Sequence, residues 1–289
     1  MPSHIFTRVG YWQESISSNM AAARAAKSSK EFHDQLHAMD YTVYAHLQLG
    51  QDEAAGQVVA EAASLVSAFD PEAGAQVGPY ALAASPARYV IERGDWKGAT
   101  QLPVRASKFA HTEAMTHFAR ALGAARSGIP EAAKADIAKL AELREKLRAA
   151  KDAYWTEQVD IQWQVATAWV LYAEGKRAEA LKAMGAAADA EDKTEKASVT
   201  PGVPTPAREL YGTMLLQSGM AGEALTAFEA TLQKEPRRLG ATIGAAKAAE
   251  KAGDAAKARR YYAAVVALAE NANPVRREIA DARAFMAKN

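Results

Sequence analysis

Histidine is the residue type whose spacing in this chain points most directly to chemistry. All six histidines lie within the first 117 residues, and His33 and His37 are four residues apart. In a helix, that spacing places two side chains on one face. We expect His4 to project from a neighbouring helix toward the same groove, with Asp40 one turn beyond His37. Three imidazoles and a carboxylate match the ligands of one Zn²⁺ or a similar divalent ion, so one hypothesis is a metal-binding protein or a metal-dependent hydrolase.

The same histidines have a structural interpretation, which we prefer. A histidine pair at this spacing often arises by chance, and imidazole commonly hydrogen-bonds where helices pack. His111 and His117 are six residues apart and do not share a helix face. The sequence also lacks a phosphate-binding Gly-rich loop, a G-x-S-x-G elbow and an H-E-x-x-H motif. On this interpretation the protein binds no cofactor and is not an enzyme.

A group of aromatic side chains suggests a different function, the binding of a peptide. Trp155, Trp163, Trp169 and Tyr172 lie close together in the sequence. Rigid aromatic side chains anchor many protein interfaces, so this group fits a peptide-binding platform. Such residues more often form a core between packed helices, which is the interpretation we prefer. Among them we expect Trp169 to be the one most exposed to a groove.

Composition narrows the classes of function. The chain has 289 residues, of which 49% are hydrophobic, and its net charge is +1. This balance provides no field that would attract nucleic acid or an anionic membrane. The absence of cysteine excludes disulfides and thiolate sites. No apolar run approaches the length of a membrane-spanning helix and no targeting signal is present, so we expect no membrane partner and a cytoplasmic location by default, with the periplasm left open.

Regularly placed glycines indicate the elements that position these residues. Each of seven glycines follows an apolar helical stretch, and a small residue, usually alanine, comes five positions later. This pattern predicts seven turns between paired helices, with successive gaps of 40, 44, 34, 47, 44 and 34 residues. The glycines are Gly10, Gly50, Gly94, Gly128, Gly175, Gly219 and Gly253.

The most regular unit runs from Glu209 to Pro236, with the sequence ELYGTMLLQSGMAGEALTAFEATLQKEP. Its order of large, small, Gly, Ala, aromatic and Pro residues resembles the tetratricopeptide repeat, a helix–turn–helix unit of about 34 residues. The resemblance implies an all-α, right-handed solenoid of about seven helical hairpins. We read the final helix, Val275 to Lys288, as a capping helix.

The N-terminal stretch MPSHIFTRVGYW resembles the later part of larger, uncharacterised bacterial tetratricopeptide proteins that carry a His-Met-Pro-Ser-His-Ile motif. Here the His before Met1 is missing, so we expect an incomplete first unit and a truncated chain. The edge of such a unit would be apolar through Ile5, Phe6 and Val9, which predicts a homodimer through the N-terminal repeat.

We treat residues 1–289 as one solenoid with three regions. Residues 1–192 form irregular repeats, 193–206 form a polar, proline-rich loop or hinge, and 207–289 form near-consensus repeats plus the cap. In the third unit, Pro79 and Pro86 should limit the first helix, and Pro103 predicts a short or kinked second helix.

A solenoid of this kind lines its concave groove with the first helix of each unit. Counting back from the turn glycines predicts these groove residues: Arg8, Tyr44, Arg88, Phe118, Arg126, Trp169 and Tyr172. The implied function is a scaffold or adaptor that binds a protein or peptide along the groove, with Phe118, Trp169 and Tyr172 as apolar anchors. No base-reading motif is present, and we expect no nucleic-acid partner.

Overall fold

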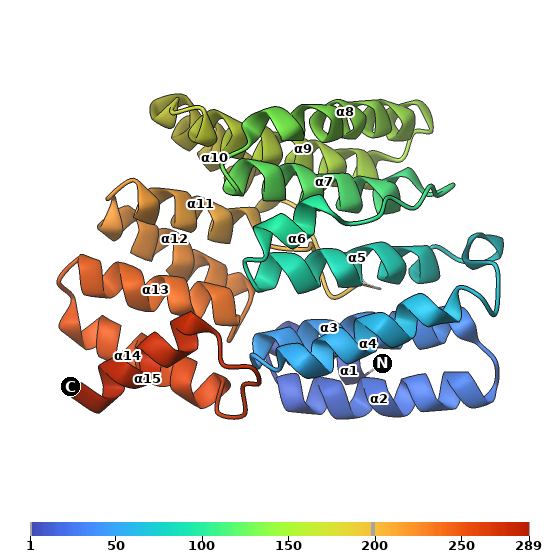
Figure 1. Ribbon diagram of the computed structural model, residues 1–289, viewed down its shortest axis with the longest axis horizontal. Helices are drawn as coiled ribbons and strands as arrows, with labels where there is room; N and C mark the ends of the chain where they lie inside the picture. Colours follow the sequence, from blue (N-terminus) through green and yellow to red (C-terminus); the bar gives the residue numbers. More distant parts are fainter. Residues whose placement is uncertain (1, 198–199, 289) are drawn as a thin grey trace.

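The computed structural model describes residues 2–197 and 200–288, and within these residues the fold is all-α (Figure 1). Two short 3-10 helices, η1 (Pro71–Ala73) and η2 (Pro130–Ala133), accompany the α-helices. Seven α-helices precede a predicted turn glycine: α1 (Pro2–Val9), α3 (Phe32–Gln48), α5 (Val77–Glu92), α7 (Ala110–Arg126), α9 (Ala153–Ala173), α11 (Ala207–Gln217) and α13 (Leu239–Lys251). The others are α2 (Trp12–Ser28), α4 (Asp52–Leu65), α6 (Trp96–Thr100), α8 (Lys134–Ala149), α10 (Arg177–Glu191), α12 (Ala221–Lys234), α14 (Ala255–Leu268) and α15 (Arg277–Lys288).

The predicted turn glycines all lie in tight turns between consecutive helices. Their φ angles fall between 65° and 82°, in the left-handed region. Glycine adopts this conformation without the steric penalty that a Cβ atom imposes on other residues. The prediction of turns at these positions is therefore confirmed.

The third helix pair departs in part from the expectation based on its prolines. Pro86 lies inside α5 rather than ending it, while α6 is short and ends at Thr100, before Pro103. An interior proline removes one backbone hydrogen bond and costs about 3 kcal/mol. Because α5 packs against α3 on one side and α7 on the other, the burial of its apolar residues offsets that cost.

The helices α3, α5, α7, α9, α11 and α13, with α10 between α9 and α11, form a closed ring. Helix α3 packs on α5, α5 on α7 and α7 on α9; α10 then packs on α11, α11 on α13, and α13 returns to α3 (Figure 1). The two ends of the chain meet at this return. The indole Nε1 of Trp12 donates to the carbonyl of Arg237 at 3.0 Å. Arg276, just before α15, donates to both carboxylate oxygens of Asp52 on α4.

The described part of the predicted hinge lies inside this ring. Residues 200–202 and 204–206 are buried and belong to the core, whereas residues 193–197 are exposed or half-buried. Prolines 201, 204 and 206 prevent it from forming a helix. In Figure 1 it passes behind α5 and α6.

Arg238, the N-cap residue of α13, joins the inner helices at the closure point. Its side chain is 1% exposed. Its Nε donates to Glu209 on α11 at 2.6 Å, its Nη1 to the Tyr44 hydroxyl on α3 at 3.0 Å, and its Nη2 to Glu92 on α5 at 2.5 Å. The side-chain oxygen of Gln48 on α3 accepts from the backbone N–H of Leu239 at 2.9 Å. One buried cation thus connects three helices to the start of a fourth.

The N-terminal edge is partly apolar, as expected. Ile5 is 65% exposed and Val9 is 41% exposed, whereas Phe6 is half-buried. Homodimerisation through this edge stays a prediction. Among the described residues, none of the helices combines the length and apolar character needed to cross a membrane.

Replacing Arg238 by Met should cost about 3–5 kcal/mol of unfolding free energy, because the substitution leaves the buried Glu92 and Glu209 carboxylates unpaired. Urea unfolding followed by circular dichroism measures this loss. Arg237→Gln is the matched control, because Arg237 is an exposed neighbour and its loss should change stability by no more than about 0.5 kcal/mol. Equal stability of the two variants would show that Arg238 does not hold the ring closed.

Candidate functional site

The 193–206 segment is held on the inner face of the ring through its backbone carbonyls. The Tyr80 hydroxyl and the Arg88 guanidinium, both from α5, donate to the carbonyl of Gly202, the former at 3.0 Å. Arg8 from α1 donates to the carbonyl of Ala197 at 2.9 Å. The inner face therefore recognises the main chain of an extended polypeptide, which in this molecule is its own.

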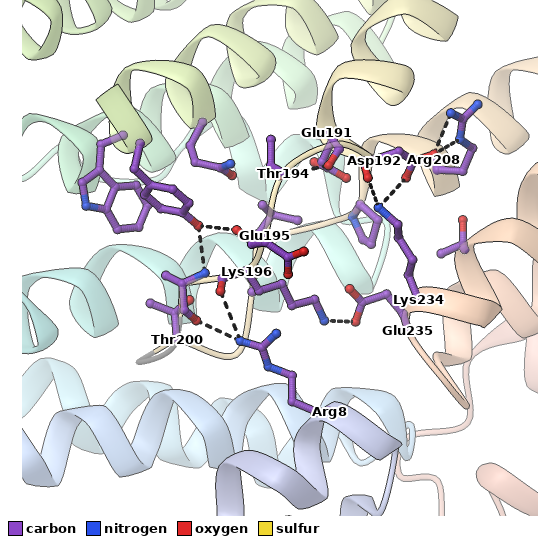
Figure 2. A pocket seen from close by; sticks show the side chains of 18 of the residues that line it. Arg8, Glu191, Asp192, Thr194, Glu195, Lys196, Thr200, Arg208, Lys234 and Glu235 are labelled. Atoms are coloured by element: carbon purple, nitrogen blue, oxygen red, sulfur yellow. Dashed lines mark hydrogen bonds and ion pairs between the residues drawn. The ribbon is translucent and has the colours of Figure 1, made fainter. Parts of the chain in front are cut away.

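A cavity of about 290 Å³ lies beside this segment, and we call it the Gln158 cavity (Figure 2). Its walls come from α1, α5, α9, α10, α11, α12 and the segment itself. They include Arg8, Tyr80, Tyr154, Trp155, Gln158, Glu191, Asp192, Lys196, Arg208, Thr231, Lys234 and Glu235. The volume is at the lower end of the roughly 300–1,000 Å³ typical of ligand pockets.

Most charges around the Gln158 cavity are paired with one another. Lys196 contacts Glu235, and Arg208 donates to Asp192 at 2.7 Å (Figure 2). Arg8 differs, because its only acceptors among the described residues are the backbone carbonyls of Lys196 and Ala197. It therefore brings a positive charge to the cavity without a carboxylate to neutralise it.

Glu191 adds an uncharged polar group. Burial raises its pKa to about 8, and its Oε1 accepts from the backbone N–H of Ala207 at 2.7 Å. A carboxyl group with this pKa is largely protonated at neutral pH and can also donate a hydrogen bond. The cavity thus offers hydrogen-bond donors beyond its cations.

Gln158 is the lining residue with an unused donor. Its side chain is 5% exposed, and its Nε2 atom is buried without a hydrogen-bond partner among the described residues. A buried donor without a partner costs about 1–3 kcal/mol. A carbonyl oxygen of a ligand bound in the cavity would relieve that cost.

The aromatic wall is rigid. Trp155 stacks on the ring of His111 with the ring centroids 4.0 Å apart and the planes 4° from parallel. The Tyr154 hydroxyl donates to the carbonyl of Glu195 at 3.1 Å and accepts from the backbone N–H of Ala197 at 2.8 Å. The aromatic side chains and the segment therefore fix each other's positions.

Only part of the predicted groove set lines open space. Arg8 lines the Gln158 cavity, and Arg126 lines a second cavity. Tyr172 is half-buried. The other four are at most 3% exposed and belong to the interior: Tyr44, Arg88, Phe118 and Trp169. Trp169, expected to be the most exposed aromatic, is 2% exposed, because the closed ring packs its inner positions against one another.

The residues of the predicted metal site are distributed over three environments. His4 and His37 meet, with their Nε2 atoms 3.1 Å apart, and His4 stacks on Tyr41. Asp40 instead accepts from Arg88 at 2.5 Å and from Ser85 at 3.1 Å.

His33 packs edge-on against Phe69, with ring centroids 5.2 Å apart, and lies against glycines 74 and 78. Within residues 2–197 and 200–288, no three His, Cys, Asp or Glu side chains are grouped so that they could hold a metal ion. The fold thus brings together two of the four expected ligands.

Comparison with known proteins adds no family assignment. A scan against protein-family models finds no match, and a search of the curated proteins finds no similar sequence. The resemblance to tetratricopeptide repeats stays a prediction.

Sequence reasoning missed Gln158 and the residues of the segment. Gln158 lies about three helical turns before Trp169 on α9, so extending the helical period back from that predicted groove residue would have identified it. Lys196 and Glu235 carried no such signal, because their meeting depends on how the segment folds back into the ring.

The histidines predict a specific pH dependence of stability. Burial lowers the pKa of His111 to about 4 from its ordinary value of 6.5. Between these values the unfolded chain takes up a proton that the folded protein does not, so stability falls as the pH drops from about 6.5 to about 4. The loss attributable to His111 should reach about 2 kcal/mol near pH 5.

The variant His111→Phe isolates this contribution, because phenylalanine keeps the stacking on Trp155 and does not titrate. Urea unfolding at about pH 7 and at about pH 5 should show a smaller acid-induced loss in the variant than in the wild type. A difference between the two proteins that does not change with pH would contradict the assignment.

Proposed function

We propose that the protein is a helical-repeat binding protein of the tetratricopeptide type, a scaffold or adaptor whose inner face takes a short extended segment of a partner protein. The proposal includes a right-handed path of about seven hairpins, which the spacing of the turn glycines supports. The observation that carries the function is the way Arg8, Tyr80 and Arg88 bind the carbonyls of the chain's own segment.

The Gln158 cavity is the place proposed for the partner segment. It continues the surface that already contacts extended backbone, and it presents Arg8, Gln158 and protonated Glu191 as donors to peptide carbonyls. Tyr154 and Trp155 form an apolar wall for a side chain. Because the segment and the aromatic side chains hold this surface in place, little ordering is needed on binding, which favours affinity.

Selection from a random peptide display library tests the proposal. Peptides enriched on the wild-type chain are synthesised, and their binding is measured by fluorescence anisotropy. We expect Gln158→Leu and Arg8→Gln each to weaken binding about tenfold, the effect of one lost hydrogen bond of about 1.4 kcal/mol.

Stability and surface controls make the result interpretable. Leucine at position 158 removes an unpartnered buried donor, so the variant should be at least as stable as the wild type. Arg148→Gln on the exposed face of α8 should leave binding unchanged. Failure to enrich any peptide, or enriched peptides that bind both cavity variants as tightly as the wild type, would overturn the proposal.

A further inference from the structure

A second cavity, of about 180 Å³, lies between α5, α6, α7, α11, α13 and α15, and we call it the Arg126 cavity. Arg126, the last residue of α7, reaches it between two indole rings. The guanidinium carbon is 4.7 Å from the ring centre of Trp96 and 4.2 Å from that of Trp169. Stacked indoles cover the faces of a guanidinium and leave the N–H groups in its plane for a hydrogen-bonding partner.

The local sequence fixes this arrangement. Asp95 accepts from the backbone N–H of Gly98 at 2.9 Å and so caps the start of α6. Gly123 on α7 allows α6 to approach closely, because a Cβ atom there would lie 2.6 Å from the carbonyl oxygen of Trp96. The backbone of Trp96 is thereby held against Gly123, which lies one helical turn before Arg126 on α7.

Two neighbouring side chains each carry a donor without an acceptor, and of the two only Arg126 lines the cavity. Nη1 of Arg126 and Nε1 of Trp169 are both buried and have no hydrogen-bond partner among the described residues. Arg126 also makes no ion pair with any carboxylate in the described part of the chain. Burial lowers the pKa of Arg126 to about 10, which still leaves it charged at neutral pH.

The other charged residues of the cavity wall are mostly paired. Glu92 and Glu209 both contact Arg238. Arg276 contacts Asp52 at 2.5 Å, and Arg93 lies 3.6 Å from the same residue. Glu278 is the lining carboxylate for which no ion pair is found in the described residues.

We propose that Arg126 forms a binding site for a single carboxylate group in this cavity. A planar carboxylate can pair edge-on with the guanidinium, whose faces the indoles cover. One unpaired cation balances one negative charge, so a carboxylate fits this wall better than a doubly charged phosphate. Glu278 opposes the incoming charge and limits the affinity.

Binding is tested with three probes, which separate the sources of such a group. They are sodium succinate, an N-acetylated alanine peptide with a free C-terminal carboxylate, and an amidated peptide with one internal glutamate. Indole fluorescence follows the titrations, with the amidated alanine peptide as the uncharged control. We expect saturable binding of at least one carboxylate probe and none of the control.

Variants then assign the binding to Arg126. Arg126→Gln should weaken the bound probe at least tenfold, Arg126→Lys should weaken it less, and Glu278→Gln should strengthen it. Thermal unfolding shows whether each variant is folded. Arg8→Gln, in the other cavity, should leave the titration unchanged, which separates this site from the proposed peptide site.

Two results would overturn the inference. The first is that no carboxylate probe changes the fluorescence of the wild type. The second is that a probe binds Arg126→Gln as tightly as the wild type. In either case the contacts with Trp96 and Trp169 only anchor the end of α7.

Discussion

The buried charge of Arg238 constrains the whole molecule. Its partners Tyr44, Glu92 and Glu209 come from helices that lie far apart in the sequence, and each is needed to satisfy a cation that is cut off from water. Separating the helices would leave several charges buried without partners, at a cost of several kcal/mol. Closure of the ring is therefore required for the paired charges to be stable, and it determines which inner surfaces stay open.

The segment inside the ring gives the two cavities a common wall. Residues of the segment line the Gln158 cavity, and Thr205 lines the Arg126 cavity. In both places, buried donors meet open space: the Gln158 amide in one, and the Arg126 guanidinium in the other. The interior therefore offers hydrogen-bond donors in both cavities, one on each side of the segment. This arrangement suits ligands that are rich in carbonyl or carboxylate oxygens.

The turns and helix pairs could be predicted from the sequence, because glycine φ preference and helical periodicity are local properties. The closure of the ring could not be predicted from the sequence. It depends on ion pairs such as Asp40 with Arg88 and Asp52 with Arg276, which no local sequence pattern links. The predicted groove residues illustrate what a local pattern can and cannot predict. The helical period selected Arg8 and Arg126, which line the two cavities, but it also selected Tyr44 and Arg88, which distant parts of the chain bury.

The meeting of α13 with α3 also changes how the protein can unfold. In a linear repeat array each end unit contacts one neighbour, so stability is a sum of local terms and the ends can fray separately. Here Trp12 is bonded to Arg237 and Asp52 to Arg276, so neither end is a free terminus of the array. Loss of one end therefore removes support from the other, so we expect the chain to unfold as a single cooperative unit. One helix pair could not be added or removed without opening the ring.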